Sequence, residues 1–176
     1  MSAPDPRKLI DSSPDPVTHD EIRRLWKKHS IAEDARDIAG LLSTLTDDCV
    51  YEIAGVERKW QGHAGARRFY EELLAAFPDV RFELRYIVIG PQGVCEEARL
   101  TGTHRGNWLG QPPTGKPVDL QVVIFFPWDP EKRLFAGERV FVAPGTVAEF
   151  FARSPLRQAK IDLTRDKDTG RSVDLT

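Results

Sequence analysis

The fold of this chain is decided by the stretch GTHRGNWLGQPPTGK, residues 102–116. Its closely spaced glycines and prolines interrupt regular secondary structure, which predicts a connector between two strands. The strands expected on either side are residues 94–108 and 117–126, each bounded by Gly or Pro. A single histidine, His104, stands at the entrance of this connector.

On both sides of the connector, apolar residues recur with a period of two, which indicates β-strands. Residues 80–88 are predicted to place alternate side chains on one face, namely Val80, Phe82, Leu84, Tyr86 and Val88. A turn is expected at residues 90–93 and a last strand at residues 134–142. Short turns between long strands predict an antiparallel meander.

The N-terminal part of the chain has helical periodicity instead. Thr18 followed by Glu21 has the pattern of a capping box and predicts the start of a first helix. A third helix is expected from Gly62 to residue 77, after a short strand at residues 49–53, and a short closing helix at residues 145–152. The second helix is predicted from one apolar stripe: Ile38, Leu41, Leu42 and Leu45.

Helices followed by a run of strands predict an α+β fold rather than an alternating βαβ fold. We expect one domain at residues 18–153. The preceding residues 1–17 are polar and proline-rich, so they cannot bury a core and are expected to be flexible. Residues 154–176 are mostly charged and are expected to form a tail, either disordered or lying along a partner subunit.

The composition is that of a globular protein, with 40% hydrophobic and 30% charged residues. The 25 basic and 27 acidic residues give a formal net charge of −2, so we expect no nucleic-acid partner. No apolar run is long enough for a membrane span or a signal peptide, and we expect a cytoplasmic protein without a membrane partner. Cys49 and Cys95 stand alone, and His, Asp and Glu lack metal-ligand spacing, so we expect neither a metal nor a cofactor.

Several short segments occur together in a characteristic order within residues 20–151. They are DDCVYE at 47–52, WQGH at 60–63, AAFPDV at 75–80, LTGTH at 100–104, GQPPTGK at 110–116 and GERVF at 137–141. In this order and spacing they resemble the SnoaL-like polyketide cyclase family of the nuclear-transport-factor-2-like group. The resemblance implies a cone-shaped, curved antiparallel sheet packed with three N-terminal helices around one deep pocket.

The resemblance also implies a chemistry. Family cyclases close a ring by an aldol step without metal or cofactor, which requires proton removal next to a carbonyl and stabilisation of the enolate oxygen. Typical members carry an aspartate on the last strand and a glutamine and a histidine on the preceding strand. In this chain the corresponding positions lie near Val140, Val122 and Ile124, which are all apolar.

Glu138 is the candidate that replaces the missing acid. It precedes Val140 by two residues and shares its strand face, where apolar neighbours would raise the pKa of a carboxyl group. Tyr51 and His104 are the further catalytic candidates, which would orient or polarise a substrate carbonyl. The alternatives stay open: Glu138 can be solvated or paired with an arginine, His104 can be a hydrogen-bonded core residue, and Tyr51 can be plain aromatic core.

Aromatic residues of the helical part are candidates for the wall of a pocket. Trp26 and His29 share the inner face of the first helix, and Trp60 precedes the third helix. Such walls suit a flat ligand, although large aromatics also fill ordinary cores. The substrate-binding set is therefore Trp26, His29, Trp60, Val122, Ile124 and Val140.

These observations lead to two functional hypotheses. The first is a cofactor-independent enzyme that acts by proton transfer on a hydrophobic, carbonyl-bearing small molecule, with cyclase-like aldol or isomerase chemistry. The second is a non-catalytic small-molecule-binding or assembly domain of the same fold, favoured by the apolar residues where chemistry is expected. A sheet face ending in Val123 and Phe125 predicts a homodimer, because an uncovered apolar patch would otherwise be exposed.

Overall fold

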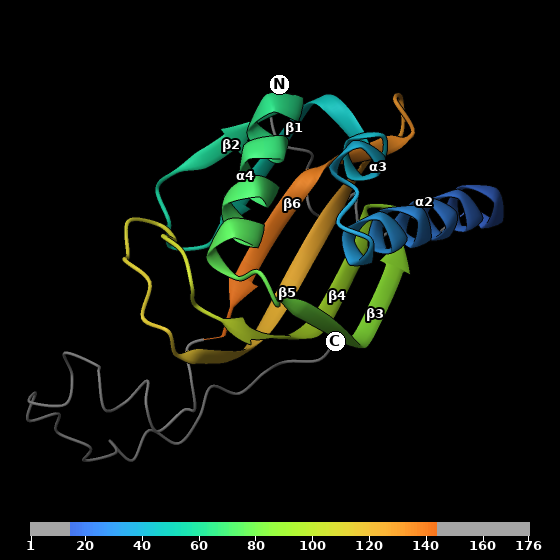
Figure 1. Cartoon of the computed structure of the whole chain (residues 1–176). Helices are drawn as coiled ribbons and strands as arrows, with labels where there is room; N and C mark the ends of the chain where they lie inside the picture. The colour runs from blue at the N-terminus through green and yellow to red at the C-terminus, as the bar shows by residue number, and fades with distance from the viewer. Residues whose placement is uncertain (1–14, 144–176) are drawn as a thin grey trace, which may run out of the picture. The chain divides into compact units, whose positions relative to one another are not determined.

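The computed structural model of the chain describes residues 15–143, which form the expected mixed α+β structure (Figure 1). The closing helix expected at residues 145–152, the tail and most of the N-terminal extension lie outside the described residues. The described helices are α2 (Pro16–Asp34), α3 (Ile38–Leu42) and α4 (Gly62–Ala76), and the strands are β1 (Leu45–Ile53), β2 (Lys59–Gln61), β3 (Arg81–Gly90), β4 (Gly93–Thr103), β5 (Pro117–Asp129) and β6 (Leu134–Val142).

The strands form one curved, unclosed sheet in the order β2-β1-β6-β5-β4-β3. The meander from β3 to β6 is antiparallel, as the turn-separated pattern predicts. The expectation of an entirely antiparallel sheet is wrong at one pair, because β1 runs parallel to β6. A period-two pattern specifies which face a side chain takes but not the neighbouring strand, so this pairing leaves no local signal in the sequence.

The first helix begins at Pro16, earlier than expected. Asp15 is its N-cap, and the Asp15 carboxylate accepts a hydrogen bond from the Thr18 backbone N–H at 3.0 Å. The predicted capping box is therefore wrong. Pro16 suits the first helical position, because a proline lacks the N–H that would stay unbonded there.

The second helix is shorter than its apolar stripe suggests. It ends at Leu42, and Leu45 is the first residue of β1 instead. Asp37 caps its start by accepting from the Gly40 backbone N–H at 2.9 Å. The apolar residues at 41, 42 and 45 all face the core, so burial alone did not distinguish helix from strand at this boundary.

Strand β3 contains an irregularity that the alternating pattern did not predict. Its pairing with β4 shifts register between Leu84 and Tyr86. The extra residue reverses which side chains face outward, because successive side chains alternate between faces. Tyr86 and Val88 are consequently 72% and 67% exposed, whereas Phe82 is half-buried and packs against the core.

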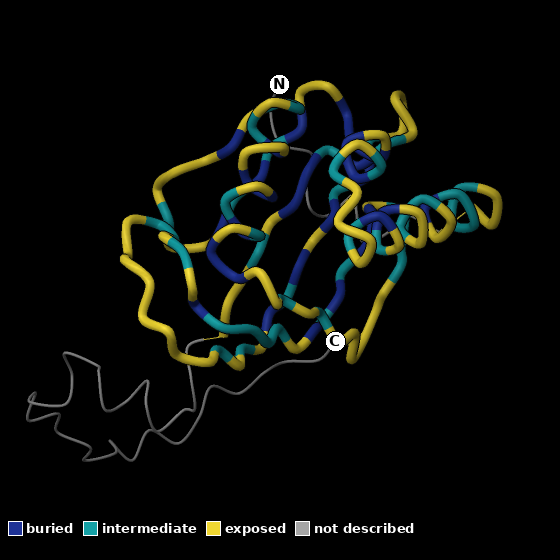
Figure 2. Tube along the Cα trace, in the orientation of Figure 1, coloured by how far each residue is buried: buried dark blue, intermediate teal, exposed yellow. Residues whose placement is uncertain are grey.

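The hydrophobic core lies between the sheet and the helices on one of its faces (Figures 1 and 2). From the sheet it receives alternate side chains such as Tyr51, Ala98, Val122 and Phe126, and from α4 it receives a stripe that includes Phe69. Figure 2 shows buried segments of the central strands behind α4, with exposed loops around them. Side chains on this inner face are therefore the ones that can meet in a site.

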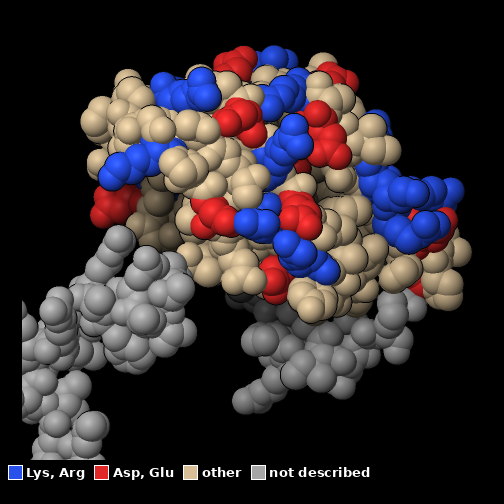
Figure 3. Space-filling model, turned by 60° about the horizontal axis from the view of Figure 1, so that its bottom comes forward, with Lys and Arg blue, Asp and Glu red and all other residues tan. Residues whose placement is uncertain are grey.

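The surface carries charges of both signs. Lys and Arg side chains alternate with Asp and Glu on the face shown in Figure 3, and ion pairs such as Arg58–Glu72 and Lys132–Asp48 span 2.7 and 2.6 Å. Among the described helices, none is long and apolar enough to cross a membrane. Within residues 15–143 no three His, Cys, Asp or Glu side chains are grouped so that they could hold a metal ion.

Candidate active site

Glu138 lies on the inner face of β6, and only 3% of the residue is exposed. The parallel pairing of β1 with β6 places it directly opposite Tyr51. The preceding residue, Gly137, has φ +121°, and a Cβ there would lie 2.0 Å from the Val50 carbonyl oxygen. A glycine is thus required where the two strands approach, and it brings Glu138 beside the side chains of β1.

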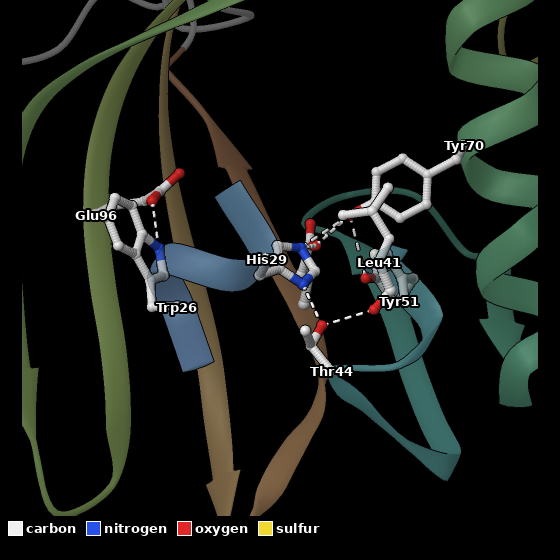
Figure 4. A network of polar contacts seen from close by, with 8 residues as sticks. Trp26, His29, Leu41, Thr44, Tyr51, Tyr70 and Glu96 are labelled. Carbon is white, nitrogen blue, oxygen red and sulfur yellow. Dashed lines mark hydrogen bonds and ion pairs between the residues drawn. The ribbon is translucent and has the colours of Figure 1, made fainter. Parts of the chain in front are cut away.

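Glu138 is the centre of a buried polar network that joins residues far apart in the sequence. Its Oε1 atom lies 2.6 Å from the Tyr70 hydroxyl of α4 and 3.0 Å from His29 Nε2 of α2. The Tyr51 and Tyr70 hydroxyls are 3.2 Å apart, and His29 Nδ1 lies 2.6 Å from Thr44 Oγ1. Figure 4 shows the labelled members of this network converging from helices and strands.

The number of available hydrogens determines which group donates in each hydrogen bond of this network. Thr44 Oγ1 gives its single hydrogen to the Leu41 carbonyl oxygen at 2.6 Å, so His29 Nδ1 must donate to Thr44. The Tyr70 hydroxyl donates to Glu138, so the Tyr51 hydroxyl donates to Tyr70. The contact between His29 Nε2 and Glu138 Oε1 then needs one hydrogen, since both atoms are acceptors without it. His29 Nε2 also lies 3.2 Å from the Tyr70 hydroxyl, so a hydrogen on this nitrogen faces both oxygens.

His29 and Glu138 therefore share one proton, either as imidazolium and carboxylate or as imidazole and carboxylic acid. Both side chains are almost fully buried, at 1% and 4% exposure. Burial and the neighbouring Glu138 raise the pKa of Tyr51 and of Tyr70 well above the usual range, so both phenols stay neutral donors. A pair that shares a proton between an acid and a base is suited to proton transfer.

Two cavities adjoin this network. The larger, of about 450 Å³, is within the usual size range of small-molecule sites, and its lining includes Glu33, Leu41, Tyr70, Leu73, Arg81 and Phe82. The smaller, of about 140 Å³, is lined by residues that include Trp26, His29, Glu33, Phe82, Glu96 and Phe126. Tyr70 and His29, which both contact Glu138, thus each face one of the two cavities.

Glu96 and Glu33 are two further carboxyl groups on the inner side. Trp26 Nε1 donates to Glu96 Oε2 at 2.9 Å (Figure 4). Burial, followed by the nearby Glu138, raises the pKa of Glu96 to about 7, although the bond from Trp26 acts in the opposite direction. Burial raises the pKa of Glu33 well above its usual range, and the neighbouring carboxyls of Glu138 and Glu96 add to the effect.

His104 lies apart from this network. Its ring stacks on Phe77 with centroids 5.2 Å apart, and its Nδ1 is 3.2 Å from Thr114 Oγ1. The His104 Nε2 atom is buried and has no hydrogen-bond partner among the described residues. The geometry thus brings Glu138, Tyr51 and His29 together but leaves His104 in the aromatic cluster beside the connector.

The remaining substrate-binding candidates occupy different surroundings. Trp26 lines the smaller cavity, whereas Trp60 is 2% exposed and packs edge-on against Phe69. Val122 and Ile124 are buried core residues at 1% and 4% exposure. Val140 is partly buried and lines a shallow depression near residues 52–56 rather than either inner cavity.

Sequence reasoning missed Glu33, Thr44, Tyr70 and Glu96. Glu96 has the strand parity of Ala98 and Leu100, so the pattern that placed His104 inward could have found it. Glu33 follows His29 by four residues, which puts both on one helix face. Tyr70 and Thr44 gave no comparable signal, because their importance comes from contacts with residues of distant elements.

Comparison with known proteins shows the family and the fold of the chain. A family model described as SnoaL-like polyketide cyclase matches residues 22–132. No curated protein matches the sequence.

Solved structures share the fold at low sequence identity. A candidate SnoaL-like polyketide cyclase from Jannaschia sp. CCS1 is 24% identical, with a TM-score of 0.61 over 81% of this chain and 95% of that one. AclR, a candidate hydroxylase from Streptomyces galilaeus, is 20% identical, with a TM-score of 0.59 over 78% and 99%. IdmH, a candidate polyketide cyclase from Streptomyces antibioticus, is 18% identical, with a TM-score of 0.56 over 69% and 91%. With the family match extending over more than half of its length, the chain belongs to the SnoaL-like polyketide cyclase family.

Proposed function

We propose that this protein is a cofactor-independent enzyme that acts by proton transfer on a hydrophobic, carbonyl-bearing small molecule. The proposed reactions are those of family cyclases, an aldol ring closure or a related isomerisation. The observation that carries the proposal is the buried His29–Glu138 pair, which shares one proton beside a cavity of about 450 Å³.

In the proposed reaction the pair receives a proton from the carbon next to the substrate carbonyl, which leaves an enolate. Tyr70 lines the larger cavity and donates to Glu138, so its hydroxyl can pass a proton between cavity and pair. After it has received this proton the pair is positively charged, which favours the negative enolate beside it. In ring closure the enolate carbon attacks a second carbonyl, and the alkoxide formed there takes the proton back from the pair. In isomerisation the pair returns the proton to another carbon of the conjugated enolate.

The roles differ from residue to residue. Glu138 is the proposed acid and base, and His29 is the proposed partner that holds or releases the shared proton. Tyr51 is a positioning residue, because its hydroxyl bonds to the Tyr70 hydroxyl, which in turn donates to Glu138. His104 receives no role in this proposal, since its contacts are with Phe77 and Thr114.

The test is proton exchange rather than turnover of an unknown substrate. The probe is 2-tetralone, an aromatic ketone with acidic hydrogens next to its carbonyl, in deuterium oxide, and NMR measures the exchange rate. We expect the protein to accelerate exchange and Glu138→Gln to lose at least about 100-fold of that acceleration, the usual size of an acid–base contribution. Glu57→Gln, in the exposed connection after β1, is the matched control and should exchange at the unaltered rate.

An unchanged rate in Glu138→Gln would remove Glu138 from the chemistry. The second candidate function, a non-catalytic binding domain, is favoured by the burial of Val122 and Ile124 at the positions where family members carry polar groups. Polyporic acid, which was co-crystallised with the structurally similar TerC, is a suitable second probe. Thermal stabilisation by either probe without exchange or any product would support the binding domain.

A further inference from the structure

Glu33 lies at the boundary between the two inner cavities. It belongs to the last turn of α2, is half-buried, and lines both the larger and the smaller cavity. Among the described residues its carboxyl group makes no hydrogen bond and no ion pair, in contrast to Glu96 and Glu138. Because Glu33 lines both cavities and its carboxyl group has no partner among the described residues, this group is available to a bound molecule.

The surroundings of Glu33 disfavour a negative charge. Glu138 approaches from β6, Glu96 from β4, and Asp34 is the next residue on α2. The charged groups that share the larger cavity with it are Asp34, Arg36, Asp79 and Arg81. Within residues 15–143 no arginine forms an ion pair with Glu33. Burial and three neighbouring carboxyls raise the pKa of Glu33, so the neutral acid is favoured.

A neutral carboxyl group has a property that no carboxylate has, because it carries an O–H that can donate a hydrogen bond. An acid kept neutral in this way can stabilise a carbonyl oxygen, and more strongly the enolate oxygen that develops during proton removal. Glu138 is enclosed by Tyr70 and His29, so it is less open to the cavities than Glu33.

We propose that Glu33 donates a hydrogen bond to an oxygen atom of the ligand, the carbonyl or enolate oxygen, in the larger cavity. This inference rests on the proposed function and adds a second group to it: the His29–Glu138 pair exchanges the proton, and Glu33 holds the oxygen. The ligand class follows from this role. It is a neutral ketone or quinone-like compound with an acceptor oxygen, and not an ammonium compound, which would need a carboxylate.

Two probes with one carbon skeleton separate these chemistries. 2-Tetralone offers a carbonyl oxygen, and 2-aminotetralin offers an ammonium group at the same position; calorimetric titration at pH 7 measures the binding of each. For 2-tetralone we expect Glu33→Gln, which keeps an N–H donor, to bind within about threefold of the unaltered protein. We expect Glu33→Ala to bind about tenfold more weakly, the effect of one lost hydrogen bond.

Equal binding of 2-tetralone by Glu33→Ala and the unaltered protein would overturn the inference. So would tight binding of 2-aminotetralin that Glu33→Gln abolishes, because Glu33 would then act as an anion. Carbon-13 NMR of glutamate-labelled protein provides a test without ligand, with the Glu33 signal assigned by its loss in Glu33→Gln. We expect a protonated Glu33 at pH 7, and an ionised Glu33 at that pH would equally overturn the inference.

These outcomes are distinguishable from failure of the proposed function. A protein that binds 2-tetralone through Glu33 but does not accelerate its exchange contradicts the proposed catalysis and leaves the hydrogen bond intact. A protein whose proton exchange depends on Glu138 but whose binding of 2-tetralone does not depend on Glu33 supports the proposed catalysis and contradicts the proposed hydrogen bond.

Discussion

Glu96 is a single buried residue that links folding to pH. Its pKa of about 7 in the folded protein lies well above that of a glutamate in an unfolded chain, near 4.3. Between these two values the folded state binds more protons than the unfolded state, so the free energy of unfolding falls as pH rises. The contribution of protonated Glu96 to the free energy of unfolding is fully present below about pH 4.5. It is lost as pH rises to about 7.

We therefore predict that Glu96→Gln makes the protein less sensitive to pH. The amide oxygen can still accept from Trp26 Nε1, while the cost of ionising a buried carboxyl disappears. Relative to the unaltered protein, the variant should gain about 1–3 kcal/mol between pH 5 and pH 8 in urea unfolding. Glu131→Gln, in the exposed turn before β6, is the control, and an equal pH slope in Glu96→Gln and the unaltered protein would contradict the prediction.

The alternation of side chains between the two faces of a strand allowed most of the sequence-based predictions about single residues. The two-residue spacing from Val140 indicated that Glu138 shares its face, and Glu138 is indeed buried on the inner side. Parity could not predict that His29 shares a proton with Glu138, because 109 residues separate them and only the packing of α2 on the sheet brings them together. The isolated position of His104 was likewise unpredictable, since burial on one face does not tell which cluster a side chain joins.

The parallel pairing of β1 with β6 is the element-level feature that builds the site. The register shifts between Leu45 and Val50, so that Tyr51 comes to stand opposite Glu138. This close approach depends on Gly137, whose Cβ would otherwise collide with the Val50 carbonyl oxygen. A backbone contact cannot be relieved by a side-chain rotation, so the strands themselves would have to separate.

We predict that Gly137→Ala destabilises the fold by at least about 3 kcal/mol in urea unfolding, since it combines a backbone collision with a conformation that alanine rarely adopts. Gly90→Ala is the matched control, because a Cβ at Gly90 meets no atom within 4 Å and its backbone is not left-handed. The control should change stability by less than about 1 kcal/mol. A similar decrease in the free energy of unfolding in both variants would contradict the specific requirement for glycine at position 137.

At the level of elements, the sequence predicted most helices and strands but not the pairing between β1 and β6. Periodicity located α4 and the meander from β3 to β6, because in those elements one face is consistently apolar. It failed at Leu45 and after Leu84, where apolar residues continue although the backbone changes from helix to strand or shifts register. The β1–β6 pair joins segments at opposite ends of the domain, so no short window of sequence contains it.

At the scale of the whole molecule, the outer face of the sheet carries exposed apolar side chains. The register places Val88, Cys95 and Phe125 in one cross-strand row, and Tyr86, Val123 and Phe141 in the adjacent region. Phe125 and Phe141 are 43% and 40% exposed, with ring centroids 5.8 Å apart. Exposed aromatic and aliphatic side chains that adjoin one another on a sheet face are typical of a surface that another chain covers.

We predict that two copies associate through this outer face, because a two-fold interface would cover the same exposed apolar side chains of both copies. Light scattering after gel filtration at micromolar concentration should give about twice the 19.9 kDa chain mass. Phe125→Asp should shift the mass to that of one chain, since association would bury an unpaired carboxylate. Ile31→Asp, which replaces an apolar residue of α2 that is 65% exposed, should leave the dimer intact. A single-chain mass for the unaltered protein would contradict the predicted dimer. A dimer that survives Phe125→Asp would show that the two copies associate through another surface.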